Sequence, residues 1–372
     1  MATDLAIFLA TSGHSGVDRL ARNLAPTLAR RGYRIDLLKV RHHGPNLDPV
    51  PNGVRVIDLG TKHVYPSLWK VAHYLRRERP ASMFCDKDRV NQTALLARAM
   101  AGVSTHLTLS MGTTVSIDLA HRGFLHRLKT RLSMGWLYRL ADNVIVTSEG
   151  VADDMSAYTG LPRRLINVVP CPIVPSRVFD GNFPKPEHPW FSDGGPPIVM
   201  GLGELGSRKD FVTLIRGFAR VRSEYPCRLM IIGRGRDRER LLATAHELGV
   251  ADAVALPGFV DAPYAWLAQA SLFAFTSLWE GLGFALIEAL AVGVPAVSTD
   301  CPSGPREILG NGRYGPLVPV GDHEALAAAM LETLRNPLPR ATLQEAAWPY
   351  EIENATTAYA QALNLPEPGT RR

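Results

Sequence analysis

Residues 270–298 contain the pattern that most restricts how this 372-residue chain can fold. An apolar run at 270–275 predicts a buried strand, a glycine-rich loop follows, and residues 284–293 predict an apolar helix. Residues 295–298 predict the next strand. Strand, loop, helix and strand in this order form a βαβ unit, whose loop lies at the carboxyl edge of a parallel sheet. The sequence therefore predicts an α/β fold and places a candidate ligand site at this loop.

Two glutamates belong to this unit, Glu280 in the loop and Glu288 about one turn inside the helix. The main-chain N–H groups of residues 282 to 285 would attract an anion such as a diphosphate. Carboxylates beside an anion are unfavourable unless they bind something else, and sugar hydroxyls fit because a carboxylate accepts several hydrogen bonds. The alternative is a solvated Glu280 and a Glu288 on the helix surface, and the apolar run around Glu288 argues against it.

A second loop follows an earlier predicted strand and carries Gly201, Gly203 and Gly206 in the G-x-G-x-x-G spacing of dinucleotide-binding folds. Arg234 follows the next strand, where an arginine that binds a 2′-phosphate would stand, so an NADP-dependent oxidoreductase is an alternative. That fingerprint requires a helix that already runs across the third glycine. Here the apolar helical pattern begins only at Phe211, which disfavours the alternative.

The same loop presents Arg208 and Lys209 just before its helix. A guanidinium offers a fork to phosphate oxygens and an ammonium offers a point charge, so the pair could neutralise a diphosphate leaving group. As plain solvated charges they would be unfavourable at a helix start, where acids are preferred. Since both loops follow strands of one parallel sheet, the sequence predicts these cations at the same edge as Glu280.

Over 4–170 and again over 198–335, short apolar runs alternate with amphipathic patterns of helical period. Pro26 interrupts the first helical pattern and predicts a kink or a late helix start. Eight prolines between 170 and 197 indicate a linker or an irregular connection. Two α/β domains follow, and the predicted parts are 1–170, a linker at 171–197, 198–345, and a C-terminal helix within 346–372 whose packing across the first domain the sequence leaves open.

Charge is distributed unevenly along the chain. Residues 1–180 carry 24 Lys and Arg against 14 Asp and Glu, whereas residues 181–372 carry 17 against 21. The first half is therefore suited to an acidic partner. Nucleic acid is disfavoured, because neither a helix-turn-helix nor a finger pattern appears.

One basic stretch, 124–139, has the pattern of an amphipathic helix. Its apolar face is formed by Leu125, Leu128, Leu132 and Trp136. Three cations, Arg127, Lys129 and Arg131, lie off that face. Such a helix can lie on an anionic membrane surface. The alternative is an ordinary domain helix with a charged outer face.

Composition limits the setting in which the chain is expected to act. No apolar run reaches the roughly 18–20 residues of a membrane span, and the start of the sequence lacks a signal-peptide pattern. The four cysteines are widely separated without metal-ligand or redox spacing, which indicates reduced thiols in a cytosol. We expect a cytoplasmic protein, peripherally associated with the inner face of the membrane.

Taken together, these residues resemble the family 4 glycosyltransferases of the GT-B fold, of the bacterial surface-polysaccharide type. The resemblance is carried by Gly203-x5-Lys209, 231–235, 256–260, Glu280-x7-Glu288 and Gly293-x-Pro295, and more loosely by 13–19 and 29–33. It implies two Rossmann-like parallel-sheet domains that face a central cleft, the first for the acceptor and the second for the nucleotide sugar. It also implies a retaining transfer that needs no metal and no other cofactor.

The resemblance assigns roles to particular residues. The predicted catalytic residues are Lys209 and Arg208, which would neutralise the donor diphosphate, and Glu280, which would contact the donor sugar. The predicted substrate-binding residues are Gly16, Gly203, Gly233, Gly258, Phe259, Val260, Gly281, Leu282, Gly283, Phe284 and Glu288. Within this set, Glu288 would bind the ribose, the 258–260 turn the base edge, and Gly16 would let the first domain approach the donor phosphate.

Two positions depart from the family pattern. Glu204 stands where the family usually has an arginine, and residues 110–114 stand where a histidine is common; His14, His106 and His121 are nearby in sequence. The predicted function is transfer of a hexose or N-acetylhexosamine from a nucleotide-diphosphate sugar, with UDP favoured over GDP, to a lipid-linked or oligosaccharide acceptor. A non-catalytic sugar-nucleotide-binding protein and a sugar-nucleotide epimerase are the further alternatives.

Overall fold

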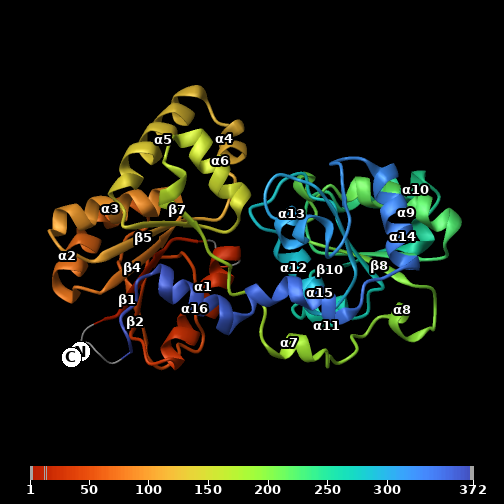
Figure 1. Cartoon of the computed structure of the whole chain (residues 1–372), viewed down its shortest axis with the longest axis horizontal. Helices are drawn as coiled ribbons and strands as arrows, with labels where there is room; N and C mark the ends of the chain where they lie inside the picture. The colour runs from red at the N-terminus through yellow and green to blue at the C-terminus, as the bar shows by residue number, and fades with distance from the viewer. Residues whose placement is uncertain (1–2, 12, 14, 369–372) are drawn as a thin grey trace. The chain divides into compact units, whose positions relative to one another are not determined.

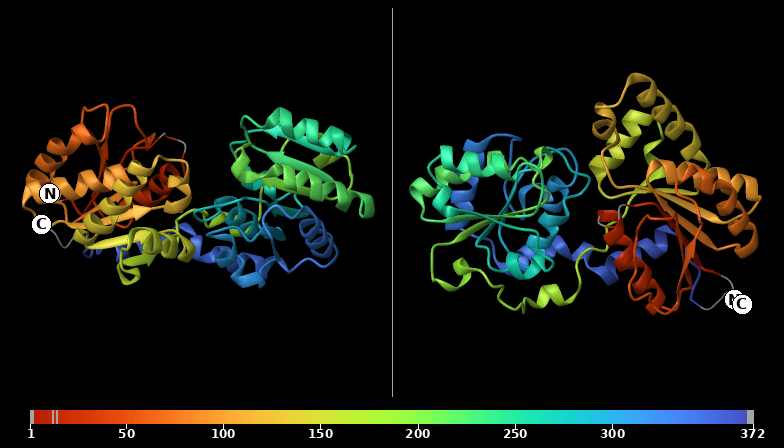
Figure 2. Two further views of the ribbon diagram at one scale, coloured as in Figure 1. Left: turned by 90° about the horizontal axis from the view of Figure 1, so that it is seen from above. Right: turned by 180° about the vertical axis from the view of Figure 1, so that it is seen from behind.

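The computed structural model describes residues 3–11, 13 and 15–368, and the chain divides into two compact units (Figure 1). The first unit is built from Met1–Ile173 and Ile352–Arg372, and the second from Val174–Glu351. Each contains a parallel sheet with helices on both faces (Figure 2). The α/β architecture with two parallel-sheet domains, predicted from the sequence, is therefore confirmed. The predicted cleft between the two domains stays a prediction.

The first unit has a sheet in the strand order β3-β2-β1-β4-β5-β6-β7, with every described pair parallel. Its strands are β1 (Leu5–Leu9), β2 (Ile35–Lys39), β3 (Val54–Asp58), β4 (Ser82–Asp86), β5 (His106–Met111), β6 (Asn143–Val146) and β7 (Ile166–Val168). Chain order reverses between β1 and β4. Side chains of β1 alternate between two hydrophobic cores, Ala6 and Phe8 on one face and Leu5, Ile7 and Leu9 on the other.

Helices cover both of these cores. They are α1 (Gly16–Arg30), α2 (Leu68–Glu78), α3 (Asp88–Ala101), α4 (Val115–Ala120), α5 (Phe124–Leu137), α6 (Glu149–Thr159) and, from the end of the chain, α16 (Ile352–Ala362). Ser15 caps α1 through a capping box with Asp18, so the helix starts early and contains Pro26 within it. The late start that Pro26 suggested is therefore wrong.

Helix α16 packs against α1 and belongs to the first unit. The Ser82 hydroxyl donates to the carbonyl oxygen of Leu363 over 2.6 Å, and the Asn143 side chain donates to that of Ala362 over 2.8 Å. Arg31 pairs with Glu353 at 2.8 Å. The end of the chain therefore completes one face of a sheet whose strands all lie in the first half of the sequence.

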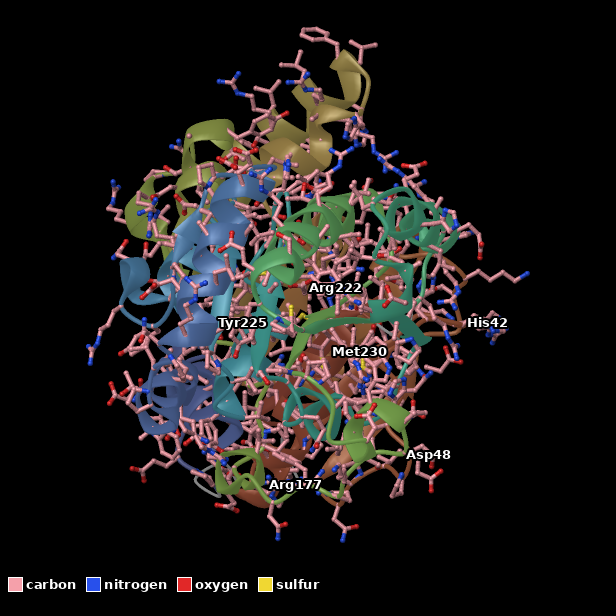
Figure 3. All side chains as sticks on the ribbon, turned by 90° about the vertical axis from the view of Figure 1, so that its right-hand side faces the viewer. His42, Asp48, Arg177, Arg222, Tyr225 and Met230 are labelled. Atoms are coloured by element: carbon pink, nitrogen blue, oxygen red, sulfur yellow. The ribbon has the colours of Figure 1, made fainter. Side chains whose placement is uncertain are left out.

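The second unit has a parallel sheet in the order β10-β9-β8-β11-β12-β13. Its strands are β8 (Ile198–Leu202), β9 (Arg228–Ile232), β10 (Val254–Gly258), β11 (Leu272–Phe275), β12 (Ala296–Thr299) and β13 (Leu317–Val318), and its helices are α7 (Arg177–Asp180), α8 (Pro189–Ser192), α9 (Phe211–Glu224), α10 (Arg238–Glu247), α11 (Pro263–Leu267), α12 (Phe284–Ala291), α13 (Pro305–Ile308), α14 (His323–Arg335) and α15 (Arg340–Ala347). Met230 of β9 lies inside this unit, whereas Arg177 of α7 lies at its edge (Figure 3).

Two of the differences between the predicted elements and the structure concern the second unit. Strand β13 was not predicted, because a two-residue strand is too short to show a periodic pattern. The proline-rich segment after residue 173 contains α7 and α8 and belongs to the second unit. Its apolar side chains Val178 and Phe191 are buried, so this segment packs on the unit and does not run as a free linker.

Candidate functional site

The two loops singled out in the sequence meet at the carboxyl edge of the second sheet. Strands β8 and β11 are neighbours, and chain order reverses between them. In open α/β sheets, ligands bind at such a reversal. The N–H of Leu278 donates to the carbonyl oxygen of Arg208 over 2.8 Å, and the Thr276 hydroxyl donates to that of Lys209 over 2.8 Å. The loop after β8 and the loop after β11 are therefore tied together where a ligand is expected.

Glu280 is the centre of this site. Its two carboxylate oxygens accept hydrogen bonds from Arg208 Nη1 and Lys209 Nζ, each over 2.7 Å, and from the Ser277 hydroxyl over 2.8 Å. The sequence placed these residues at one edge but did not predict that the two cations pair with the acid. The alternative of a solvated Glu280 is wrong, since its exposed fraction is 7%.

Burial separates the roles that the two cations can take. Lys209 is 8% exposed, and burial lowers its pKa, although the Glu280 carboxylate acts in the opposite direction. For Glu280, burial raises the pKa but the charges of Lys209 and Arg208 outweigh it, so the net shift is downward. The Arg208 side chain is 39% exposed. The Lys209–Glu280 pair is therefore enclosed, whereas part of the Arg208 side chain is open to solvent.

Neighbouring residues hold Lys209 in place. Its ammonium lies 4.6 Å above the ring of Phe275, the last residue of β11. A β-carbon at Gly203 would lie only 2.8 Å from Lys209 Cε, so a side chain there would displace the lysine. The Thr299 hydroxyl of β12 donates to the carbonyl oxygen of Ser277 over 2.7 Å. Sequence analysis missed Phe275, Ser277 and Thr299, although a hydroxyl residue directly after a buried strand was a usable signal.

The glycines in the loops after β8 and β9 allow the backbones of these two loops to come into direct contact. The N–H of Gly203 donates to Ile232, and the N–H of Leu205 donates to Arg234. A β-carbon at Gly233 would lie 1.8 Å from the carbonyl oxygen of Gly203, whereas one at Gly206 would meet nothing within 4 Å. The third glycine of the apparent dinucleotide fingerprint therefore packs against no helix. Because α9 begins only after a further turn, the geometry of that fingerprint is absent.

Helix α12 carries the second glutamate. Glu288 is buried in this helix, so the helix-surface alternative is wrong. Gly283 caps the start of α12 with φ of +110°, a backbone conformation that glycine adopts readily. A β-carbon at Gly304 would lie 1.8 Å from the carbonyl oxygen of Leu282, and the N–H of Glu280 donates to Pro302 over 3.2 Å. The segment after β12 therefore packs directly against the loop that consists of Gly281, Leu282, Gly283 and Phe284.

The predicted base-contacting turn lies at the same edge, after β10. Gly258 ends β10 and accepts a hydrogen bond from the N–H of Gly233 over 2.9 Å. Phe259 is 57% exposed and Val260 is half-buried. The guanidinium of Arg234 lies 5.5 Å above the ring of Phe259. The structure thus places Gly203, Gly233, Gly258 and Phe259 around one sheet edge with Glu280.

The first unit contains a polar group that sequence analysis missed. Asp86 ends β4, is buried beside Ser110 of β5, and burial raises its pKa to about 6. His106 begins β5, which places it at the amino edge, opposite Asp86. Gly16 is the exposed first residue of α1, and His14 lies outside the described residues. No histidine therefore fills the position after β5 in the described part of the chain.

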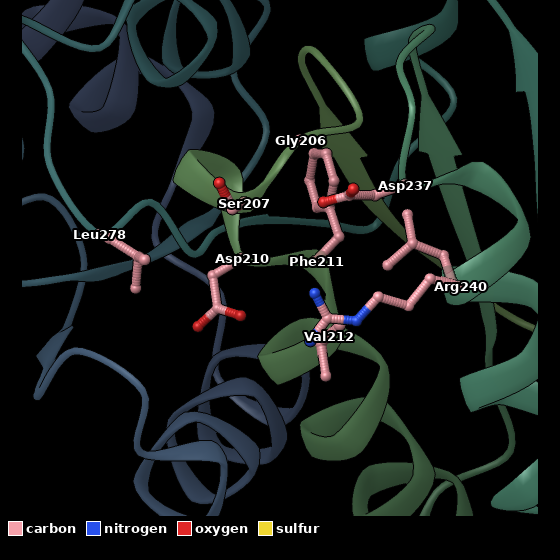
Figure 4. Close-up of a pocket in the computed structure, with 9 residues that line it drawn as sticks. Gly206, Ser207, Asp210, Phe211, Val212, Asp237, Arg240 and Leu278 are labelled. Carbon is pink, nitrogen blue, oxygen red and sulfur yellow. The ribbon is translucent and has the colours of Figure 1, made fainter.

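A small cavity of about 180 Å³ borders the basic loop, and its polar lining comes from Ser207, Asp210, Asp237 and Arg240 (Figure 4). Ligand pockets usually enclose about 300–1,000 Å³. Lys209, Glu280 and Glu288 do not line this cavity. The candidate site at the sheet edge around Glu280 is therefore not this cavity. Among the described residues, no three His, Cys, Asp or Glu side chains gather as a metal-binding group.

Comparisons with known proteins give matches over most of the chain. Residues 15–172 match the family model described as a glycosyl transferase 4-like domain, and residues 184–348 match glycosyl transferases group 1. The N-acetylgalactosamine-N,N'-diacetylbacillosaminyl-diphospho-undecaprenol 4-alpha-N-acetylgalactosaminyltransferase of Campylobacter jejuni is 27% identical over 87% of each chain. The lipopolysaccharide core biosynthesis glycosyltransferase LpsE of Rhizobium meliloti is 31% identical over 63% of this chain and 66% of its own.

Solved structures share the fold. The lipopolysaccharide outer core galactosyltransferase WaaB aligns with a TM-score of 0.76 at 19% identity, over 97% of this chain and 99% of its own. Anabaena HepE in complex with UDP aligns with a TM-score of 0.78 at 17% identity, over 97% of this chain and 100% of its own. With glycosyltransferase models on both halves, the NADP-dependent oxidoreductase alternative is wrong. The chain belongs to the family 4 glycosyltransferases of the GT-B fold.

Proposed function

We propose that this enzyme moves a hexose or N-acetylhexosamine from a nucleotide-diphosphate sugar, UDP favoured over GDP, to a lipid-linked or oligosaccharide acceptor with retention of configuration. The observation that carries the proposal is the buried Lys209–Glu280 pair with Arg208 at the reversal point of the second sheet. The Campylobacter relative is named for transfer to a diphospho-undecaprenol-linked sugar, and the HepE structure contains UDP. Both names are compatible with this donor and this acceptor class.

Charge neutralisation at the leaving group is the main catalytic effect that we assign. The oxygen of the acceptor hydroxyl would bond to the anomeric carbon as the bond to the diphosphate oxygen breaks. The bonding electrons leave with the diphosphate, and the departing diphosphate oxygen would take the proton of the acceptor hydroxyl. Lys209, already desolvated, would stabilise this charge without a metal, and Arg208 would turn from Glu280 toward the phosphates. Glu280 would then accept hydrogen bonds from the sugar hydroxyls, and Glu288 from the ribose.

Donor binding and transfer can be measured directly. We expect a UDP- or GDP-sugar at 100 times its Kd to stabilise the folded protein by about 2.7 kcal/mol, visible as a higher unfolding temperature. With an acceptor lipid or oligosaccharide present, NMR of the product should show the donor's anomeric configuration, and EDTA should leave the rate unchanged. An inverted product would refute retention. If no nucleoside diphosphate or its sugar stabilises the protein, the donor proposal fails.

We further propose that helix α5 binds an anionic membrane surface. Of the residues on its apolar face, Leu125 is 78% exposed and Trp136 is 74% exposed, and Phe124, Leu128 and Leu132 are exposed as well. Only Thr130 and Met134 of this helix are buried. The apolar face therefore points to solvent, which favours a membrane-bound helix over an ordinary domain helix with a charged outer face.

Charge supports a membrane as the occupant of this face. Arg127, Lys129 and Arg131 are exposed beside the apolar residues. Cations next to Trp and Leu suit the headgroup boundary of an anionic bilayer, and each cation near such a surface contributes about 1 kcal/mol. Within the described residues, no helix is both long and apolar enough to cross a membrane. Contact through one helix lying in the interface is consistent with this.

Replacing Leu125, Leu132 and Trp136 together with Gln is expected to weaken binding to phosphatidylglycerol vesicles at least tenfold, about 1.4 kcal/mol, because each loses apolar area that enters the interface. Sedimentation at low and high salt measures this, and wild-type binding should fall as salt rises. The control replaces three exposed apolar residues of the second unit, Trp348, Leu248 and Leu338. Salt-independent binding, unchanged binding by the triple variant, or self-association through this face would contradict the proposal.

A further inference from the structure

Arg234 is a cation at the carboxyl edge of the second sheet that the transfer chemistry above does not use. It follows β9 and is exposed, and its guanidinium lies 5.5 Å above the ring of Phe259. Within the part of the chain that the structure describes, this ring is the one partner found for the guanidinium. Phe259 follows the adjacent strand β10 and is itself 57% exposed. The two side chains present a cationic and an aromatic surface side by side to solvent.

The main chain fixes this pair relative to the basic loop. The carbonyl oxygen of Arg234 accepts the N–H of Leu205 over 2.9 Å, and Gly233 donates to Gly258 over 2.9 Å. A β-carbon at Gly235 would lie 2.2 Å from the carbonyl oxygen of Leu205, so the backbones are in direct contact. Leu205 belongs to the loop that carries Arg208 and Lys209. The Arg234–Phe259 surface is therefore built onto the same frame as the diphosphate site.

Spacing within the sheet places this surface where a base would lie. Neighbouring strands are about 4.8 Å apart, so the loops after β9 and β10 are about 5 and 10 Å from the loop after β8. That is the direction and reach of a nucleoside whose diphosphate is held at Lys209. A base can stack on an aromatic ring or on a guanidinium plane, and a guanidinium can also donate hydrogen bonds in its own plane.

We propose that Arg234, held against Phe259, recognises the base of the donor nucleotide and favours a base with a carbonyl oxygen at its edge, uracil or guanine, over adenine. Arginine donates well to such oxygens, as it does to O6 and N7 of guanine, whereas adenine presents an amino donor in place of O6. The proposal rests on the proposed function, because it assumes a nucleotide at this edge. It assigns Arg234 to base selection and leaves the transfer step to Lys209 and Glu280.

The test is a calorimetric titration of UDP, GDP and ADP into the full-length wild type and three variants. We expect the wild type to bind UDP or GDP at least tenfold more tightly than ADP. Arg234→Ala should weaken that preferred binding about tenfold or more, through the loss of a charged hydrogen bond, and should leave ADP within about twofold. Phe259→Ala should weaken all three nucleotides through lost stacking. The control, Arg236→Ala, removes another exposed cation of the same loop and should change none of the three Kd values.

Three results would overturn the inference. If the wild type binds UDP or GDP but Arg234→Ala leaves every Kd unchanged, Arg234 does not read the base, and the donor proposal stands. If Arg234→Ala weakens ADP as much as UDP and GDP, the arginine binds phosphate or ribose, which all three share. If the wild type binds none of the three nucleotides, the proposed function fails together with this inference. Thermal unfolding of each variant is the check on folding, and we expect unfolding temperatures close to that of the wild type because all three substitutions are at exposed residues.

Discussion

Lys209→Met is expected to lower kcat about 10²–10³-fold, the loss typical of removing one charge-stabilising group from an active site. The ammonium is desolvated and fixed by Glu280 and Phe275, so its charge acts on the departing diphosphate without prior rearrangement. Arg208 remains, but its side chain is 39% exposed, so solvent screens its charge more strongly than that of Lys209. Steady-state kinetics with saturating donor measure the effect, and Lys185→Met, at an exposed lysine of the same unit, is the control.

Loss of stability must be separated from loss of catalysis in this variant. Removing one partner of a buried ion pair costs about 3–5 kcal/mol, and Arg208 would compensate only in part. The double variant Lys209→Met with Glu280→Gln removes both buried charges. We expect it to regain most of the wild-type unfolding temperature while kcat stays low. Wild-type kcat in either variant would rule out the assigned role of Lys209.

Gly233→Ala is expected to destabilise the second unit by about 3 kcal/mol or more, from overpacking together with backbone strain. The added β-carbon would lie 1.8 Å from the carbonyl oxygen of Gly203, and φ at residue 233 is +150°. The two loops must then separate, which breaks the hydrogen bonds that position the Lys209 loop. For a unit of this size, the unfolding temperature should fall on the order of 10 °C, measured by calorimetry. Affinity for the donor should fall as well.

Gly206→Ala is the matched control for this prediction. A β-carbon there meets nothing within 4 Å, and its φ of −143° suits any residue. We expect an unfolding temperature within about 1–2 °C of the wild type, as for most surface substitutions without a specific feature. If Gly206→Ala lowered the unfolding temperature strongly and Gly233→Ala lowered it little, the assignment of close packing to Gly233 would be wrong. The loop would then have the packing of helix on strand that is typical of dinucleotide-binding folds.

The sequence predicted the order of the elements around this site better than the side-chain contacts within it. The order of elements in 270–298 could be read because a buried strand, a glycine loop and an apolar helix each leave a periodic pattern. The contact between Lys209 and Glu280 could not, because it joins residues from two different loops whose backbone path sets where side chains point. At Asp210, for example, the backbone turns with a φ of +44°, and no periodic pattern in the sequence predicts such a turn.

Two other features show why local patterns were insufficient. Arg234 was singled out in the sequence for a 2′-phosphate, yet its contact with Phe259 depends on the pairing of β9 with β10. Asp86 was not singled out in the sequence, and its raised pKa follows from burial, which the hydrogen bond with Ser110 and the charge of Lys87 offset only in part. In both cases the chemistry follows from neighbours that are distant in sequence.

The packing of α16 on α1 also determines when the first unit can be completed during synthesis. Its sheet emerges from the ribosome early, but the helix that covers one face of it emerges only after the whole of the second unit. Until then the pocket for Tyr359, lined in part by Phe84, is open to water. The nascent chain must therefore expose apolar surface throughout translation of the second unit, which makes this interval the one in which chaperone binding or aggregation has its best opportunity.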